Sequence, residues 1–386
     1  MKLRSLYLEN FRSYNKLNLK IEDSKFIILT GKNGVGKTNL LEAISFLSPG
    51  KGFKNCNIEE VVKSNSNIQK SNIFFVINDG KEKNEIGIEF LKQKDFKDKR
   101  AKKIIFLNGK KIKKQALLPD VVSIIWLTPE MDIFFRTNSI IRRKFLDRCI
   151  FNLKPKYLEY LRFYDKNLKE RNKILKDISK KDLFYVLGKY KEKDLWLKKI
   201  EEKIVDISLK IFSDRNKFVN DFNSLTNNFK NFPKIKIFLN GKIEELLTKI
   251  NSEKIKEVYL EKLIDCRKID SIKGSISYGP SKSDLKVLFL KKKIFAEECS
   301  TGEQKIILIS LIIQFCKLMN KKKSFPILLL DEIVAHLDEK VKKSLFEELK
   351  SLKNQVWMTG AENNFFIPII KSEDVLNLKI EDYIKE

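Results

Sequence analysis

The sequence predicts an α/β fold in which a mixed sheet with helices and an antiparallel lobe form one domain, interrupted by a mainly helical arm. Three observations support this prediction. An apolar run at 26–30 leads into a glycine-rich loop and a helical pattern, and a second apolar run at 325–330 ends in two acids. From about residue 142, apolar residues instead recur every three or four positions. We expect the α/β domain to comprise residues 1–127 and 271–386, and the arm residues 128–270.

The composition indicates a folded and strongly basic protein. The 386-residue chain is 42% hydrophobic, which is ample for a core. No apolar run reaches the roughly 20 residues of a membrane span, and the first residues lack the apolar stretch of a signal peptide. Five scattered cysteines are typical of a reducing compartment, so we expect a cytoplasmic protein without a membrane partner. The formal charge of +27 favours a nucleic-acid partner, although an AT-rich genome also produces such a lysine-rich composition.

Loose alternation over residues 3–21 predicts a β-hairpin with Phe11-Arg12-Ser13-Tyr14 at its turn. Arg12 is a candidate contact to nucleotide phosphate or to DNA. A solvated arginine at a turn would give the same pattern.

Residues Gly31 to Thr38 fit the phosphate-loop pattern G-x-x-x-x-G-K-[ST] between a predicted strand and a predicted helix. Glycines let successive N–H groups converge on phosphate oxygens, and the helix start adds a positive dipole end. We expect Lys37 to bridge the outer phosphates and to assist catalysis, and Thr38 to place its hydroxyl on Mg²⁺. The predicted ATP-binding residues of this loop are Asn33, Gly34, Val35, Gly36, Lys37, Thr38 and Asn39.

A breaker-rich segment at 48–54 follows the loop helix and returns towards the nucleotide. It makes Lys51 and Lys54 candidates for contacts to phosphate or DNA, with ordinary loop lysines as the alternative. Beyond it, short strands are expected in an antiparallel sheet, followed by a buried strand that stops before Pro129. These strands are 73–77, 86–90, 103–107 and 121–127.

The arm is predicted to hold several helices within 140–225, including a long amphipathic one. Its apolar positions are Leu183, Val186, Leu187, Tyr190, Leu197, Ile200, Ile204, Ile207 and Ile211. Because heptads are not sustained, an extended coiled coil is not expected. After a break at Pro233, alternation predicts strands at 234–238 and 272–278 around a helix at 253–265.

The apolar run before Asp331 and Glu332 is typical of a parallel strand buried on both faces. Ligands bind at the carboxyl edge of such sheets, so Asp331 is expected to hold Mg²⁺ through water. Glu332 is placed to orient the attacking water and accept its proton. The alternative is that Glu332 only caps the next segment.

Upstream, Ser300, Gly302 and Gln304 open an apolar helix that begins near residue 306. Ser300 is a predicted N-cap, and a helix start that presents hydroxyl and N–H groups can bind an anion. A plain N-cap would explain the same pattern.

These three motifs, in this order, resemble an ABC-type ATPase head, with S-x-G-x-Q as the signature. The resemblance implies that the signature of one subunit closes on the ATP held by the other, which gives an ATP-sandwiched homodimer. Ala335-His336-Leu337-Asp338 resembles the D-loop at the seam of such a dimer.

Further segments narrow the resemblance to the RecF family within the SMC/ABC-type superfamily. They are Phe11–Tyr14, Gly31–Ile44, Gly50–Lys54, Leu127–Glu130, Arg142–Asp147, Tyr278–Pro280 with Asp284-Leu285, and the signature and Asp331 segments. Family membership implies slow, DNA-stimulated ATP hydrolysis and DNA binding at single-strand gaps during recombinational repair and replication. It also implies action with RecR and RecO to promote RecA loading.

The chain departs from the family pattern at several positions. Ser281-Lys282 replaces His-Arg, Lys51 and Lys54 replace arginines, and Ile125 stands where a Mg²⁺-sensing glutamine is usual. Glu130 is the candidate substitute for that glutamine, and Thr359 for an absent switch histidine. Two alternatives stay open: an ATPase subunit that energises another complex, such as a transporter, and a nucleotide-gated scaffold that recruits proteins.

Overall fold

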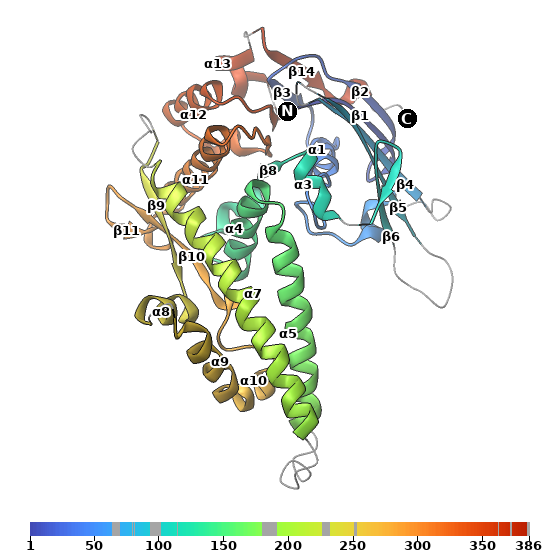
Figure 1. The fold of residues 1–386 in the computed structure, drawn as a ribbon. Helices are drawn as coiled ribbons and strands as arrows, with labels where there is room; N and C mark the ends of the chain where they lie inside the picture. Colours follow the sequence, from blue (N-terminus) through green and yellow to red (C-terminus); the bar gives the residue numbers. More distant parts are fainter. Residues whose placement is uncertain are drawn as a thin grey trace. The chain divides into compact units, whose positions relative to one another are not determined.

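The computed structural model describes residues 1–63, 70–78, 80, 82–92, 102–113, 115–179, 191–225, 232–250, 253–361, 363–370 and 373–383. The chain forms two compact units (Figure 1). The head unit comprises residues 1–132, 229–232 and 305–386, and the arm unit comprises residues 133–228 and 233–304. The expected domain limits at 127 and 270 remain a prediction.

A five-stranded parallel sheet forms the centre of the head unit, in the order β14-β3-β13-β12-β8. Every residue of four of its strands is buried, which explains their mostly apolar sequences. These strands are β3, β8, β12 and β13. The strands expected at 26–30 and before Asp331 are confirmed. The strand expected from residue 121 begins at Ile124, because Pro119 supports a short helix, α3 (Leu118–Val121). The sheet contains β3 (Phe26–Thr30), β8 (Ile124–Leu127), β12 (Ile327–Leu330), β13 (Val356–Thr359) and β14 (Val375–Lys379).

A six-stranded antiparallel sheet is the second layer of the head unit, in the order β2-β1-β4-β5-β6-β7. Its buried side chains alternate along β4 and β5 and join one apolar core with residues of β3 and the helix after it. The expected hairpin at 3–21 and the expected antiparallel strands are confirmed. The strands are β1 (Lys2–Phe11), β2 (Tyr14–Lys20), β4 (Lys70–Asn78), β5 (Lys83–Leu91), β6 (Lys102–Leu107) and β7 (Lys110–Ile112).

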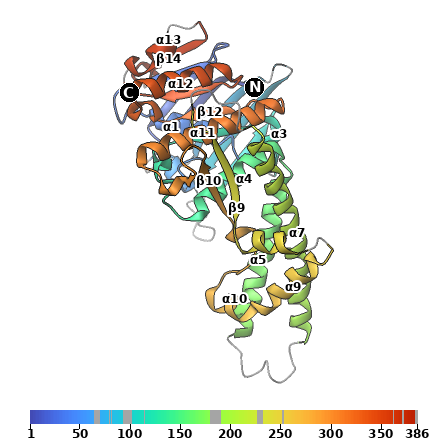
Figure 2. The same ribbon diagram turned by 90° about the vertical axis from the view of Figure 1, so that its left-hand side faces the viewer.

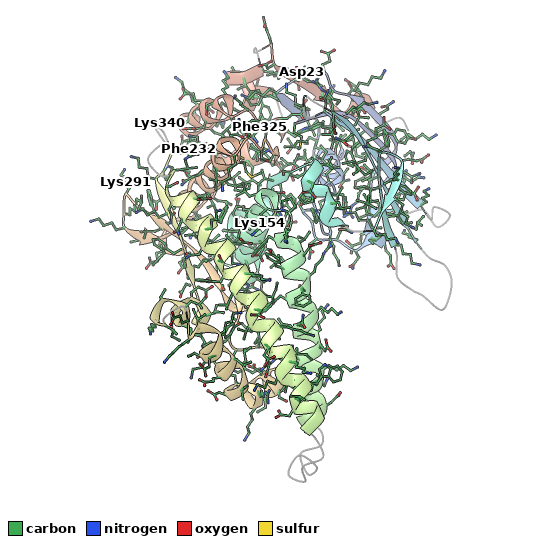
Figure 3. The ribbon with its side chains drawn as sticks, viewed as in Figure 1. Asp23, Lys154, Phe232, Lys291, Phe325 and Lys340 are labelled. Carbon is green, nitrogen blue, oxygen red and sulfur yellow. The ribbon has the colours of Figure 1, made fainter. Side chains whose placement is uncertain are left out.

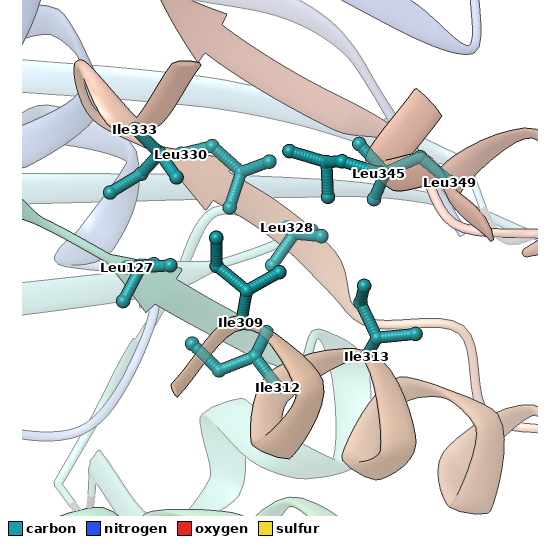
Figure 4. Close-up of a pocket in the computed structure, with 9 residues that line it drawn as sticks. All are labelled: Leu127, Ile309, Ile312, Ile313, Leu328, Leu330, Ile333, Leu345 and Leu349. Carbon is teal, nitrogen blue, oxygen red and sulfur yellow. The ribbon is translucent and has the colours of Figure 1, made fainter. Parts of the chain in front are cut away.

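Helices cover the parallel sheet. Figure 4 shows residues of α11 and α12 facing β8 and β12 around a wholly apolar cavity lined by Leu, Ile and no polar side chain. This packing fixes the strand that ends at Asp331. Within the described residues, no helix is long and apolar enough to cross a membrane. Besides α3, the described helices that lie wholly or mostly in the head unit are α1 (Lys37–Ser45), α2 (Ile58–Val61), α11 (Thr301–Lys321), α12 (Glu339–Ser351) and α13 (Ile367–Ile370), of which α2 contacts β5 of the antiparallel sheet.

The arm unit is mainly helical, as expected, and Figures 1 and 2 show its two long helices, α5 and α7, side by side. A small antiparallel sheet, β11-β10-β9, accompanies them. The expected apolar positions Leu183, Val186, Leu187 and Tyr190 lie outside the described residues. The elements are α4 (Ser139–Leu153), α5 (Tyr157–Ser179), α7 (Lys191–Asn223), β9 (Ile235–Asn240), α8 (Lys242–Lys249), α9 (Ile255–Asp265), α10 (Arg267–Lys273), β10 (Asp284–Phe289) and β11 (Ile294–Phe295).

The prediction of a strand at 272–278 is wrong. Residues up to Lys273 belong to α10, which Gly274 ends in the left-handed region with φ 63°. The partner of β9 is instead β10, whose burial alternates residue by residue from Asp284 to Phe289. The apparent alternation around Ile276 is too short to compete with a helix that buries Asp270.

Buried charges tie the arm helices together. Arg171 of α5 is fully buried, with Nε 2.9 Å from Glu201 Oε1 of α7 and Nη1 2.7 Å from Asp270 Oδ2 of α10. At the surface, by contrast, Lys154 (labelled in Figure 3) lies 2.6 Å from Asp214 and over the ring of Tyr160. The buried cluster therefore specifies how three helices pack, because unpaired charges there would be very costly.

Candidate functional site

The loop between β3 and α1 is built on glycines with positive φ. Gly31, Gly34 and Gly36 have φ values of 142°, 84° and 109°, a region that other L-residues rarely adopt. A Cβ added to Gly34 would meet nothing within 4 Å, so this side of the loop is open to a ligand. A Cβ on Gly36 would lie 2.8 Å from Ser13 Oγ. Asn33 is exposed, and the Val35 N–H donates to the Lys32 carbonyl at 3.3 Å.

Lys37 is the first residue of α1, and its ammonium turns back into the loop. Nζ donates to the carbonyl oxygens of Gly31 at 2.6 Å and Lys32 at 3.0 Å, and the residue is only 4% exposed. The first N–H groups of α1 have no partner within their helix. Together they and Lys37 form a concentrated positive site for phosphate.

The β1–β2 hairpin braces this loop. Tyr14 Oη donates to the Gly36 carbonyl at 3.0 Å, and Asn39 Nδ2 donates to Ser13 Oγ at 3.1 Å. Burial raises the pKa of Tyr14, so its hydroxyl stays protonated. The sequence analysis singled out Arg12 in this hairpin but did not predict the contact of Tyr14 with the loop. The only signal for that contact is a large aromatic residue beside a turn.

Glu42 of α1 pairs with Arg12 and Lys54, two of the candidate contacts to phosphate or DNA. It is fully buried, and Arg12 donates to both of its oxygens at 2.9 and 2.8 Å, while Lys54 Nζ lies 3.8 Å away. Burial alone would lower the pKa of Arg12, but the hydrogen bonds and charge of Glu42 raise it on balance. Arg12 and Lys54 therefore satisfy the buried carboxylate of α1, whereas Lys51 is exposed and donates to Asn57 Oδ1 at 3.3 Å. Glu42 was missed, although a glutamate within an apolar helix pattern is a usable signal.

Asp331 lies at the carboxyl end of β12, where two threonines converge on one of its oxygens. Thr38 Oγ1 donates to Asp331 Oδ1 at 3.1 Å and Thr359 Oγ1 at 2.8 Å. Asp331 is 4% exposed, and burial raises its pKa against the opposing effect of the two hydroxyls. The fold thus joins residues 293 positions apart at the edge of one sheet.

Glu332 follows in a strained conformation. Its φ of 51° and ψ of 21° are left-handed, and its N–H donates to Thr359 Oγ1 at 2.8 Å. Such conformations cost about 1–3 kcal/mol and occur where the surrounding fold enforces them, often at active sites. Glu332 is partly exposed, and its side chain makes no capping hydrogen bond to the helical turn that follows. The alternative that Glu332 only caps this segment is therefore not supported.

The oxygen set around Asp331 suits a cation that keeps much of its water. Among the described residues, no group of three or more His, Cys, Asp or Glu side chains is arranged to hold a metal. Thr38 and Asp331 supply one hydroxyl and one carboxylate, which is the sparse protein contribution typical of Mg²⁺ bound with a nucleotide.

The signature residues open α11 within the arm unit. Ser300 and Glu303 cap each other: the Glu303 N–H donates to Ser300 Oγ at 3.4 Å, and the Ser300 N–H donates to Glu303 Oε2 at 3.2 Å. Gly302 is exposed, and a Cβ there would meet nothing within 4 Å. Gln304 is buried and donates to the Cys299 carbonyl at 3.0 Å, so it shapes the turn from within.

Glu381 completes the surroundings of the loop and was not predicted. It lies in the turn Ile380–Tyr383 that follows β14, and its Oε1 accepts a hydrogen bond of 2.7 Å from the Lys32 N–H. The hydrogen bond with Lys32 is the main cause that lowers the pKa of Glu381. No local pattern signals this contact, because 349 residues separate the partners. The side chain of His336, in the predicted D-loop, lies outside the described residues.

Comparison with known proteins gives consistent matches over nearly the whole chain. The family model for the RecF/RecN/SMC N terminal domain matches residues 2–371 of this chain. The chain is 37% identical to the DNA replication and repair protein RecF of Rickettsia canadensis (strain McKiel), over 92% of this chain and 93% of the relative. It is 38% identical to RecF of Rickettsia rickettsii (strain Sheila Smith), over 94% and 96%. A solved structure of the recombination mediator protein RecF-ATP in the RecFOR pathway superposes with a TM-score of 0.80 at 24% identity, over 98% of this chain and 95% of that one, which shows the same fold.

Proposed function

The chain belongs to the RecF/RecN/SMC family, within it to the RecF DNA replication and repair proteins, and on this premise we propose an ATP-dependent DNA-binding function in recombinational repair. Two ATP-bound copies close on DNA at single-strand gaps, and slow hydrolysis releases them. The protein acts in the cytoplasm with RecR and RecO to promote RecA loading. The signal shared by all these steps is the binding of a nucleoside triphosphate.

One observation carries the proposal: the hydrogen bond from Thr38 to Asp331, beside an ammonium held in the loop. This arrangement places the first turn of α1 and a carboxylate at the end of β12 on either side of the position proposed for the phosphates. When ATP binds, Lys37 exchanges its two carbonyl partners for outer phosphate oxygens. Thr38 and Asp331 are then placed to hold Mg²⁺, which would neutralise charge on the phosphates.

Glu332 is proposed as the general base. Its carboxylate orients a water molecule towards the outer phosphate and accepts its proton, and the strained backbone at this residue is of the kind that active sites retain. Thr359 already donates to Asp331 and accepts from the Glu332 N–H, so it links the two acids. A threonine gives weaker charge stabilisation than a histidine, which supports slow hydrolysis.

The second half of each site is proposed to come from another copy of the chain. Ser300 and the open position at Gly302 present a hydroxyl and N–H groups that an approaching phosphate can reach. Gln304 holds this turn in shape through the Cys299 carbonyl. The +27 charge then favours DNA phosphates, and Lys51 is an exposed candidate contact, whereas Arg12 and Lys54 pair with Glu42 of α1.

The test is retention of DNA in the presence of ATP and Mg²⁺, compared between the wild type and Lys37→Ala. We expect the variant to lose ATP-stimulated retention of gapped duplex DNA while keeping its fold, since Lys37 is the only described ammonium inside the loop. Lys32→Ala is the matched control, because its side chain is exposed in the same loop. Unchanged ATP-stimulated retention by Lys37→Ala would refute the proposal.

A further inference from the structure

The phosphate loop has a carboxylate fixed against its first turn. β14 pairs with β3 on the side opposite β13, so the turn after β14 reaches the loop that follows β3. There Glu381 Oε1 is held by the Lys32 N–H, and Oε2 is covered but has no hydrogen-bond partner in the described part of the chain. A Cβ on Gly31 would lie 2.5 Å from Oε2, so the glycine makes room for this oxygen.

The same two residues also hold Lys37. Its Nζ donates to the carbonyl oxygens of Gly31 and Lys32, while the N–H of Lys32 donates to Glu381. The turn at Gly31 and Lys32 therefore binds the Lys37 ammonium through its carbonyl oxygens and the Glu381 carboxylate through the Lys32 N–H. In the nucleotide-free protein these opposite charges attract each other.

A triphosphate changes this balance. Lys37 pairs with the phosphate oxygens, and the phosphates add negative charge to the loop whose first turn Glu381 contacts. Its hydrogen bond with Lys32 keeps it ionised, and the β14 pairing keeps it in place. The repulsion grows with the number of phosphate charges, so it affects ATP more than ADP.

We propose that Glu381 is an affinity-determining residue of the nucleotide site, whose negative charge weakens ATP binding and lowers the preference for ATP over ADP. The inference rests on the proposed nucleotide binding and adds a new residue to that site. It gives a switch protein a physical means of limiting the lifetime of its ATP-bound form.

Glu381→Gln tests the charge, because the amide oxygen can still accept the Lys32 N–H. Calorimetric titration should show ATP binding about three- to tenfold tighter than wild type, an order-of-magnitude estimate for two charges near a protein surface. ADP should gain less, and the gain should shrink as salt is added. Asp382→Asn is the matched control: it removes the same charge from the exposed neighbour of Glu381 and should leave both affinities unchanged.

The alternative outcomes are distinct. Unchanged or weaker ATP binding by Glu381→Gln, or equal gains for ATP and ADP, would overturn the inference. Weaker binding by Glu381→Ala together with wild-type binding by Glu381→Gln would show that the contact only shapes the loop, which also overturns it. Circular dichroism establishes that each variant is folded. If wild type and Asp382→Asn both fail to bind ATP, it is the proposed nucleotide function that fails.

Discussion

Asp331, which we propose holds Mg²⁺, lowers the stability of the folded protein through its burial. Burial raises the pKa of its carboxyl above the ordinary value of 3.8, so the folded state holds the proton more tightly than the unfolded state. Wild-type stability therefore falls as the pH rises from that ordinary value through the raised pKa. At neutral pH the buried carboxylate is ionised, and it then lowers the free energy of unfolding by its full amount.

We expect Asp331→Asn to raise the melting temperature of the nucleotide-free protein at pH 7 by about 1–3 °C and to abolish Mg²⁺-dependent ATP hydrolysis. The asparagine oxygen can still accept from Thr38 and Thr359, while the buried charge is gone. Thermal unfolding at pH 7 and near pH 4 checks the sign, because the advantage should disappear at the lower pH. A variant less stable than wild type at pH 7 would contradict this reading of the site.

At the scale of elements, the arm depends on one buried arginine. Arg171 of α5 binds Glu201 of α7, Asp270 of α10 and the Leu263 carbonyl of α9. Arg171→Met leaves the buried Asp270 without its charged partner and leaves Glu201 paired with Arg267 alone, and we expect a loss of about 3–5 kcal/mol in the free energy of unfolding of the arm. Urea unfolding followed by circular dichroism measures this loss.

The control for that experiment is Lys256→Met. Lys256 and Asp206 lie 2.7 Å apart, but their side chains are 67% and 55% exposed, so water screens the pair. Its loss should cost less than about 1 kcal/mol. Equal effects of the two substitutions would mean that the buried cluster does not hold the arm helices together.

The elements also show what the sequence can and cannot predict. The phosphate loop and its strand were predictable because the glycines, the lysine and the flanking periodicities are contiguous. The prediction of a strand at 272–278 was wrong because it relied on alternation over only a few residues and gave too little weight to Gly274, which ends α10. Residues that act on the loop from a distance, such as Glu42 on Arg12 and Glu381 on Lys32, depend on tertiary pairings that no local pattern encodes.

At the scale of the whole molecule, the proposed function requires that ATP joins two copies of the chain. In this proposal each copy holds the triphosphate in its loop, and the exposed Ser300 turn of the other copy supplies further contacts. The net charge of +27 opposes association of free copies, so the bound phosphates must contribute attraction that offsets this repulsion.

The most direct test of this claim is the mass of the protein in solution, measured by analytical ultracentrifugation with and without ATP and Mg²⁺. Glu332→Gln is the best form to use, since it should bind ATP but hydrolyse it too slowly to release the pair. We predict that the mass doubles from the 45.4 kDa of one chain when both ATP and Mg²⁺ are present, and that Lys37→Ala does not respond. A mass that is the same with and without nucleotide would contradict the account.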